Sequence, residues 1–451
     1  MQRRRRIRLG GALGALAAGA GIAALVVGLT AGSSARVLHV RNGPVVDVRD
    51  FRGHGRLAFV SRDRLWVLNG HGALRQIPTP AGLHPLEPVF SPDGKWLAYV
   101  ETSFSPANVA GGGLLPGELW IAHADGSGAV RIRGVGDAVP LAWNPRRDLL
   151  AVTNSDGKRL WIVTPQGELR QVARDFWIQG AVWSPDGTRL AVFADRSRGP
   201  ETVSVLSFRT GGKTVWLSFR QNDRLNGMGA VVLGPAGWWK GFGLGFWVFG
   251  NGAVHNSDAT PLDIVRGPGA RPRLLARTLS DGTTDAVAAS SAGVLAVAAD
   301  HGGDRVFWQY RRLEVCRPGS SCVQIVPSAA KVTVDPAWSP NGRLLAFVEA
   351  PNLSYPGWPQ KLLHRWYDAH RLLVYDTVSG RTIRVAGAAG ATNPVWSQDG
   401  KSLLYVAHDA LWLLRNLSAR PVEIATPLFP AKNWPAYYGQ VAWLQQFAWS
   451  S

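Results

Sequence analysis

Several short segments of the chain place an aspartate close to a histidine, and they contain His255 and Asp258, His301 and Asp304, His364, Asp368 and His370, and His408 and Asp409. Imidazole and carboxylate groups ligate zinc and also serve as general acids and bases. If these side chains converge, they predict a metal or catalytic centre. If they are scattered over polar turns, they predict no chemistry. We therefore treat His255, His301 and His408 as metal-ligand candidates and assign no catalytic residue and no cofactor.

One long segment, residues 350–370, is unusually rich in aromatic and imidazole side chains. Aromatic side chains supply large contact areas in protein interfaces. The segment predicts a binding surface, whose candidate residues are Tyr355, Trp358, His364, Trp366, Tyr367 and His370. A second aromatic run, residues 237–249, alternates with glycine and is more typical of a buried strand.

The chain has two cysteines, Cys316 and Cys322, on either side of Arg-Pro-Gly-Ser-Ser. A hairpin turn over these residues would bring the two Cβ atoms within bridging distance. In an exported chain this spacing predicts a disulfide. A metal site would need more ligands than the pair offers.

A repeated phrase determines which elements position these residues. Its clearest copy is Trp183-Ser-Pro-Asp-Gly-Thr-Arg-Leu-Ala-Val-Phe193, and similar copies begin at Phe90, Trp143, Trp338 and Trp396. Proline presets φ in the turn, aspartate hydrogen-bonds to its own backbone, and glycine accepts a positive φ. Each copy therefore predicts a β-hairpin. The interval between Trp183 and Trp338 has room for two degenerate units, near 230–249 and 286–297, and residues 45–60 align as the first unit.

Most copies are followed by two further apolar segments, such as 160–163 and 169–172. Four short antiparallel strands in each unit of 40–60 residues predict a β-propeller blade. We expect an all-β propeller over residues 45–451 with eight blades, or seven if the terminal segments share one. The tail, residues 440–449, carries another first-strand pattern and should pair with the first blade. Connections between second and third strands share one face, and the long ones lie at 101–117, 194–201, 250–260 and 350–370. Because binding residues usually lie on such loops, we expect this to be the working face.

The N-terminus has a different composition. A basic segment, residues 1–8, precedes an uncharged apolar run at residues 9–31, which is long enough to span a bilayer. The positive flank predicts a cytoplasmic N-terminus and an extracytoplasmic propeller joined by a short linker at residues 32–44. The alternative is a signal peptide cleaved near Ala35. The formal net charge is +18, which would favour an anionic membrane or acidic partners, whereas the predicted topology argues against nucleic acid.

The Trp-Ser-Pro-Asp-Gly hairpin resembles the repeat of TolB-like propellers, which also occurs in prolyl oligopeptidase-type enzymes. The resemblance implies the fold over most of residues 45–449 and little about function. The chain has no Gly-x-Ser-x-Gly elbow of the hydrolase domain. The sequence thus predicts a membrane-tethered, non-catalytic binding module for an envelope protein, peptide or glycan. The alternative is a lyase or hydrolase that acts on an envelope polysaccharide through His and Asp groups.

Overall fold

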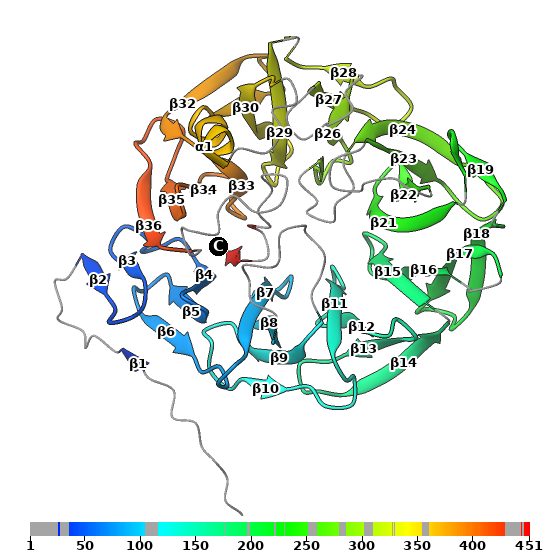
Figure 1. The fold of residues 1–451 in the computed structure, drawn as a ribbon, viewed down its shortest axis with the longest axis horizontal. Coiled ribbons are helices and arrows are strands. Elements are labelled where there is room, and N and C mark those ends of the chain that lie inside the picture. The colour runs from blue at the N-terminus through cyan, green and yellow to red at the C-terminus, as the bar shows by residue number, and fades with distance from the viewer. Residues whose placement is uncertain are drawn as a thin grey trace, which may run out of the picture.

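The fold is an eight-bladed β-propeller in the part of the chain that the structure describes (Figure 1). This structure is a computed structural model and describes residues 26–27, 36–103, 116–175, 177–195, 199–220, 222–229, 231–250, 259–278, 286–301, 310–326, 328, 330–353, 360–428, 443 and 446–451. Each blade has four antiparallel strands, of which the first lies nearest the central axis, and additional strands extend the sheets of blades 1 and 8 at their outer edges. The predicted all-β class and the count of eight blades are confirmed.

Blade 1 contains a degenerate copy of the repeated hairpin, and blades 2 to 4 contain the copies that begin at Phe90, Trp143 and Trp183. Blade 1 consists of β37 (Phe447–Ser450), β4 (Arg56–Ser61), β5 (Arg64–Asn69) and β6 (Leu74–Ile77). Blade 2 consists of β7 (His84–Phe90), β8 (Trp96–Thr102), β9 (Glu118–His123) and β10 (Val130–Arg131). Blade 3 consists of β11 (Ala138–Trp143), β12 (Leu150–Asn154), β13 (Arg159–Val163) and β14 (Leu169–Arg174). Blade 4 consists of β15 (Trp177–Trp183), β16 (Arg189–Asp195), β17 (Glu201–Ser207) and β18 (Lys213–Phe219).

The two degenerate units form blades 5 and 6, as predicted. Blade 5 consists of β21 (Val232–Trp239), β22 (Gly243–Phe249), β23 (Thr260–Val265) and β24 (Arg273–Thr278). Blade 6 consists of β25 (Val287–Ala289), β26 (Leu295–Asp300), β27 (Arg311–Cys316) and β28 (Val323–Gln324). Blade 7 consists of β29 (Lys331–Trp338), β30 (Leu344–Pro351), β31 (Arg371–Asp376) and β32 (Thr382–Ala389). Blade 8 consists of β33 (Thr392–Trp396), β34 (Leu403–Ala407), β35 (Ala410–Leu414) and β36 (Val422–Thr426).

Both ends of the propeller chain close the ring. The C-terminal strand β37 pairs with β4 as the inner strand of blade 1, which confirms the prediction for the tail. The alignment of residues 45–50 with a first strand was wrong, because β3 (Val45–Asp47) pairs instead with β36 at the outer edge of blade 8. The strand β2 (Val37–His39) pairs with β3 and lies inside the segment expected to be a linker. An inner strand from one terminus and outer strands from the other therefore join blades 1 and 8.

The structure does not show the predicted transmembrane helix. Of the apolar run at residues 9–31, only Val26 and Val27 are described, and they form the short strand β1 (Val26–Val27) at the outer edge of β6. Among the described residues, no helix is both long and apolar enough to cross a membrane.

The repeated tryptophan joins neighbouring blades. The Trp183 indole donates a hydrogen bond to the Ala142 carbonyl of the preceding blade at 3.2 Å, and Trp396 does the same to Ala337 at 3.0 Å. The turn aspartate is equally structural, because the Asp186 carboxylate accepts hydrogen bonds from the Thr188 amide and the Ser184 hydroxyl. The residues of the repeated hairpin therefore form the turns and the contacts between blades.

Candidate binding face

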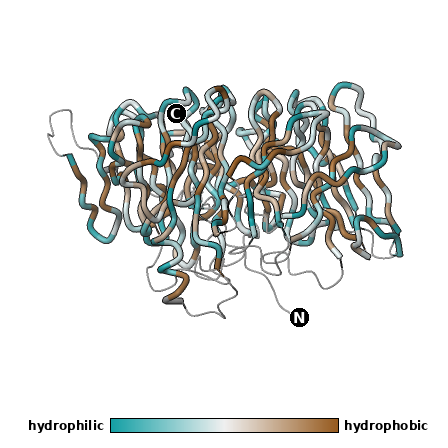
Figure 2. Tube along the Cα trace, turned by 90° about the horizontal axis from the view of Figure 1, so that it is seen from above, coloured by the Kyte–Doolittle hydropathy of each residue, from teal (hydrophilic) through white to brown (hydrophobic). Residues whose placement is uncertain are grey.

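The connections between second and third strands all leave the blades at one end of the disc, which we call the long-loop face. The opposite end carries the connections between first and second and between third and fourth strands, and we call it the turn face. In Figure 2 the disc is seen edge-on, with strands running between the two faces. The one described α-helix, α1 (Gln360–Asp368), lies between β30 and β31 and so belongs to the long-loop face. It occupies the segment that the sequence singled out for binding.

The inward side of α1 packs on blade 7. Leu363, Trp366 and Tyr367 are buried and form a small apolar cluster with Val332 of β29 and Ala350 of β30. The Trp366 indole also donates a hydrogen bond to the Pro351 carbonyl at 2.9 Å. These contacts hold the helix on the ends of two strands. Two of the aromatic side chains expected to contact a ligand thus serve as the base of the helix in this structure.

His370 lies directly behind this cluster and is 1% exposed. Its ring centroid is 4.4 Å from that of Trp366 and 4.8 Å from that of Tyr367. Burial lowers its pKa to about 3, so the imidazole is neutral at physiological pH. The Nδ1 atom lies 3.1 Å from the Ala391 carbonyl, which fits a neutral ring that donates from Nδ1. A buried neutral ring joins α1 to the start of blade 8 and does not reach the surface.

The outward side of α1 presents polar groups. Arg365 and Asp368 are exposed, and His364 is partly exposed. The Asp368 carboxylate lies 3.5 Å from Nδ1 of His408, which is in the β34–β35 turn of blade 8. The ion pair, when His408 is protonated, ties the end of the helix to the neighbouring blade. Blade 7 and blade 8 together therefore support a fixed surface of mixed charge.

The histidines that could have formed a metal centre do not converge in the described part of the chain. His301 contacts Glu314 at 3.0 Å, His408 contacts Asp368, and His370 contacts only backbone and aromatic rings. Tyr355, Trp358 and His255, with Asp258 and Asp304, lie outside the described residues. Among the described residues one group has metal-ligand spacing, namely Glu314, Cys316 and Cys322, whose ligand atoms lie within 4.8 Å of one another.

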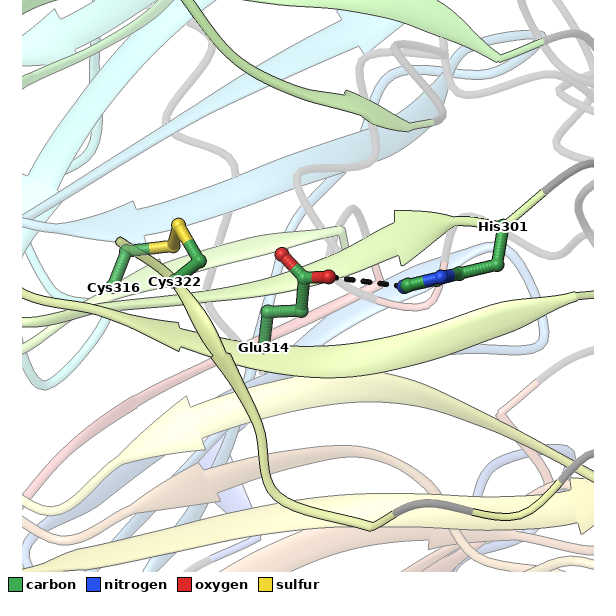
Figure 3. The surroundings of a disulfide bond; sticks show 4 residues. All are labelled: His301, Glu314, Cys316 and Cys322. Atoms are coloured by element: carbon green, nitrogen blue, oxygen red, sulfur yellow. Dashed lines mark hydrogen bonds and ion pairs between the residues drawn. A yellow bond between two sulfur atoms is a disulfide. The ribbon is translucent and has the colours of Figure 1, made fainter.

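Those two cysteines form the predicted disulfide, which is confirmed (Figure 3). The bond closes the connection between β27 and β28, with Glu314 beside it and the His301 ring on the far side of Glu314. Because both sulfur atoms are bonded to each other, they are not available as thiolate ligands. The group therefore offers a metal ion only one carboxylate.

Sequence reasoning missed a set of polar residues on the inner strands. Glu87, Asp335 and Asn393 have positive φ values at bulges of β7, β29 and β33, and each precedes a proline. The Asp335 carboxylate accepts hydrogen bonds from the Thr392 hydroxyl at 2.7 Å and the Asn393 amide at 3.1 Å, so it joins blade 7 to blade 8. The signal was present in the sequence, because an acidic or amide residue followed by proline stands three residues before Phe90, Trp338 and Trp396.

Sequence reasoning also missed two buried carboxyl groups. Glu101 in β8 and Glu201 in β17 are 1% and 5% exposed, and burial raises the pKa of each to about 7. Glu201 accepts hydrogen bonds from the Gln179 side chain and from the Leu233 amide of blade 5, each at 2.9 Å. It is therefore a contact between blades 4 and 5. No pattern in the repeat distinguishes it from a surface glutamate at the start of a strand.

Comparison with known proteins adds structural relatives but no family. No protein-family model matches the chain, and no curated protein matches its sequence. Among solved structures, an oligogalacturonate lyase in complex with manganese is similar, with 13% identity, coverage of 82% of this chain and 84% of that chain, and a TM-score of 0.43. The β-propeller domain of the Trilobed protease from Pyrococcus furiosus shows 11% identity, coverage of 79% and 98%, and a TM-score of 0.42. A structure described as the eukaryotic initiation factor shows 15% identity, coverage of 84% and 87%, and a TM-score of 0.49.

The structural relatives are β-propeller proteins. At these identities and TM-scores they carry no argument about activity. The propeller assignment rests on the sheet topology of this chain, and a TolB-like family membership is not shown.

Proposed function

We propose that the chain is a membrane-tethered, extracytoplasmic propeller that binds an envelope protein, peptide or glycan through its long-loop face and performs no chemistry of its own. The proposal is based on the contacts that hold α1 against blades 7 and 8. Buried side chains fix its inner side to blade 7, and the Asp368–His408 contact joins it to blade 8. A fixed, mixed-charge surface loses little conformational entropy when it binds a partner.

The contact residues on this surface are His364, Arg365 and Asp368. Tyr355 and Trp358 precede α1 in the same connection, and we include them as contact residues on their chemistry alone. Tyrosine and tryptophan combine a large apolar body with a polar tip, a combination that is frequent at binding surfaces. In the described part of the chain, His301, His364, His370 and His408 do not come together in one site. The alternative of a polysaccharide lyase or hydrolase therefore has no cluster of histidines to support it.

The tether is supported by the arginine-rich segment at residues 1–8 and the uncharged run that follows it. Insertion of the whole run in a bilayer requires Val26 and Val27 to leave the edge of β6. Alkaline carbonate extraction of native membranes tests this part. A retained chain supports the tether, and release of the chain supports cleavage near Ala35.

Affinity capture from a native envelope extract tests the binding face. The full chain in detergent is compared with the double variant Arg365→Glu, Asp368→Lys and with Lys401→Glu, a charge reversal on the turn face. We expect a partner that is recovered with the wild type and with Lys401→Glu but is lost with the double variant. A partner retained by all three proteins would refute this face. Stoichiometric metal in the purified chain without any captured partner would instead favour the enzyme alternative.

A further inference from the structure

The turn face carries an arc of exposed arginines. Between the third and fourth strands of blades 4–8, the connections cover residues 208–212, 266–272, 317–322, 377–381 and 415–421, and none of them contains an acidic residue. They contribute six exposed arginines that form no ion pair with a described carboxylate, and these are Arg209, Arg266, Arg271, Arg317, Arg381 and Arg420. We call this set the arginine arc. Five successive blades therefore present positive charge from the same structural position.

Positive charge without an acidic residue distinguishes these five connections from the equivalent connections of blades 2 and 3. The equivalent connections of blades 2 and 3, residues 124–129 and 164–168, contain Asp125 and Glu168 and no basic residue. The connections between first and second strands on the same face carry both signs in ion pairs, as in Lys95 with Asp93 and Lys401 with Asp399. A high arginine content spread evenly over the surface would not produce this difference.

An exposed aliphatic side chain stands in the same arc. Val378, in the blade 7 connection, is 77% exposed, the largest exposed fraction among the large hydrophobic side chains of the described residues. Its amide donates a hydrogen bond to the Asp376 carboxylate at 2.8 Å, so the turn that carries it is held in place. An aliphatic tip three residues from Arg381 suits the boundary between lipid headgroups and acyl chains.

We propose that the arginine arc docks the propeller on the anionic surface of the membrane in which the chain is anchored, with the long-loop face turned away from the bilayer. The inference rests on the tether of the proposed function. A lysine or arginine close to an anionic lipid surface is attracted to it by about 1 kcal/mol. The blade ends lie close to one plane (Figure 2), so the arginines spread charge over a flat area rather than along a groove.

The entry point of the chain agrees with this orientation. Arg36 contacts Asp50 at 2.8 Å, and Asp50 contacts Arg415 in the blade 8 connection at 2.5 Å. Arg36 is thereby fixed on the turn face. Residues 32–36 reach at most about 17 Å when extended. An apolar run that ends at residue 31 and lies in the bilayer therefore holds this end of blade 8 close to the lipid surface.

Nucleic acid is the less suitable occupant. Proteins that bind single-stranded nucleic acid interleave basic groups with aromatic side chains on which bases stack. The exposed large aromatic side chains of the described residues, Trp177 and Tyr310, lie at strand starts on the long-loop side of the blades. The arginine arc is instead accompanied by an exposed valine.

A fluorescent probe at position 378 tests the docking. The chain has no cysteine besides the disulfide pair, so Val378→Cys can be labelled with an environment-sensitive dye in the full chain. The labelled protein is reconstituted into phosphatidylcholine vesicles with and without phosphatidylglycerol, and a nitroxide on the lipid headgroups serves as quencher. Lys158→Cys, in the β12–β13 turn of the long-loop face, is the matched probe. We expect quenching at 378 that requires phosphatidylglycerol and is relieved by salt, and no quenching at 158.

The arginines are tested by substitution in the 378-labelled chain. Arg317→Gln, Arg381→Gln and Arg420→Gln together should lower the docking equilibrium constant roughly 100-fold. The matched control, Arg62→Gln, Arg64→Gln and Arg159→Gln, removes the same charge from the long-loop face and should leave the docking equilibrium constant unchanged. Equal quenching at positions 378 and 158 would overturn the proposal. Quenching that persists when Arg317, Arg381 and Arg420 are replaced would also overturn it. So would an arginine-dependent response to an oligonucleotide without any response to vesicles.

The two proposals can fail separately. The capture experiment depends on Arg365 and Asp368, whereas docking depends on the arginine arc at the opposite face. Release of the chain by carbonate removes the tether, and loss of headgroup quenching in a chain that carbonate does not release removes the docking alone.

Discussion

The buried carboxyl of Glu201 makes the stability of the propeller depend on pH. Burial raises its pKa from the ordinary 4.5 to about 7, and the nearby Asp195 carboxylate raises it further, while the Leu233 amide opposes the shift. Between these two pH values the unfolded chain releases a proton that the folded chain keeps. The free energy of unfolding therefore falls as the pH rises through this window. At pH 8 the folded protein holds a buried anion between blades 4 and 5.

The size of the effect follows from the shift. A difference of about 2.5 pKa units corresponds to about 3 kcal/mol. Glu201→Gln should remove this contribution, because the amide stays neutral at every pH. The two hydrogen bonds now accepted by Oε1 of Glu201, from Leu233 and Gln179, can both be accepted by the amide oxygen. The variant should therefore resemble the wild type at pH 4.5 and be more stable than it at pH 8.

Urea unfolding followed by tryptophan fluorescence at pH 4.5 and pH 8 measures the difference. The wild type also contains Glu101, whose pKa shifts in the same direction, so its total decline exceeds the contribution of one residue. Glu168→Gln, an exposed carboxyl on the turn face, is the matched control and should keep the wild-type decline. If Glu201→Gln loses stability between the two pH values as steeply as the wild type, the reasoning is refuted.

Three further changes test the blade contacts. Trp183→Phe removes the indole hydrogen bond to Ala142 and should cost about 1–3 kcal/mol in urea unfolding, whereas the same change at the exposed Trp177 should be nearly neutral. Reduction of the Cys316–Cys322 bond, which closes a short loop, should lower the free energy of unfolding by about 2 kcal/mol; an unchanged unfolding midpoint would contradict a structural role. Deletion of residues 447–451 exposes the edge of β4, and size-exclusion chromatography should show self-association through that edge; a stable monomer would argue against closure by β37.

The repeat made much of the architecture predictable. Proline, aspartate and glycine at fixed turn positions, followed by a strand of small and apolar residues, predicted the hairpins. The spacing of the hairpins predicted eight blades. The disulfide followed from two cysteines on one hairpin. The assignment of residues 45–50 to the first strand of blade 1 was wrong because the sequence of a strand does not determine which strand it pairs with. Strand β3 of this segment pairs with the outer strand β36 of blade 8 instead.

The binding segment shows the same limit at the level of side chains. Residues 360–368 carry aromatic residues that suit either a contact surface or an apolar base. Trp366, Tyr367 and His370 became the base because the ends of β29 and β30 present Val332 and Ala350 to them. Arg365 and Asp368 were left outward by the turn of the helix. Composition alone could not separate the two groups.

The sequence by itself determined the local elements of this protein, because turn chemistry and the alternation of apolar residues act over a few neighbouring positions. Tertiary structure decided which distant residues meet. Asp335 meets Asn393, Glu201 meets Leu233, and His301 lies beside Glu314 whereas His370 is buried against Trp366. It also gathered six arginines from five blades on one face, since closing the ring places equivalent connections side by side. Contacts of this kind depend on ring closure, which no single repeat encodes.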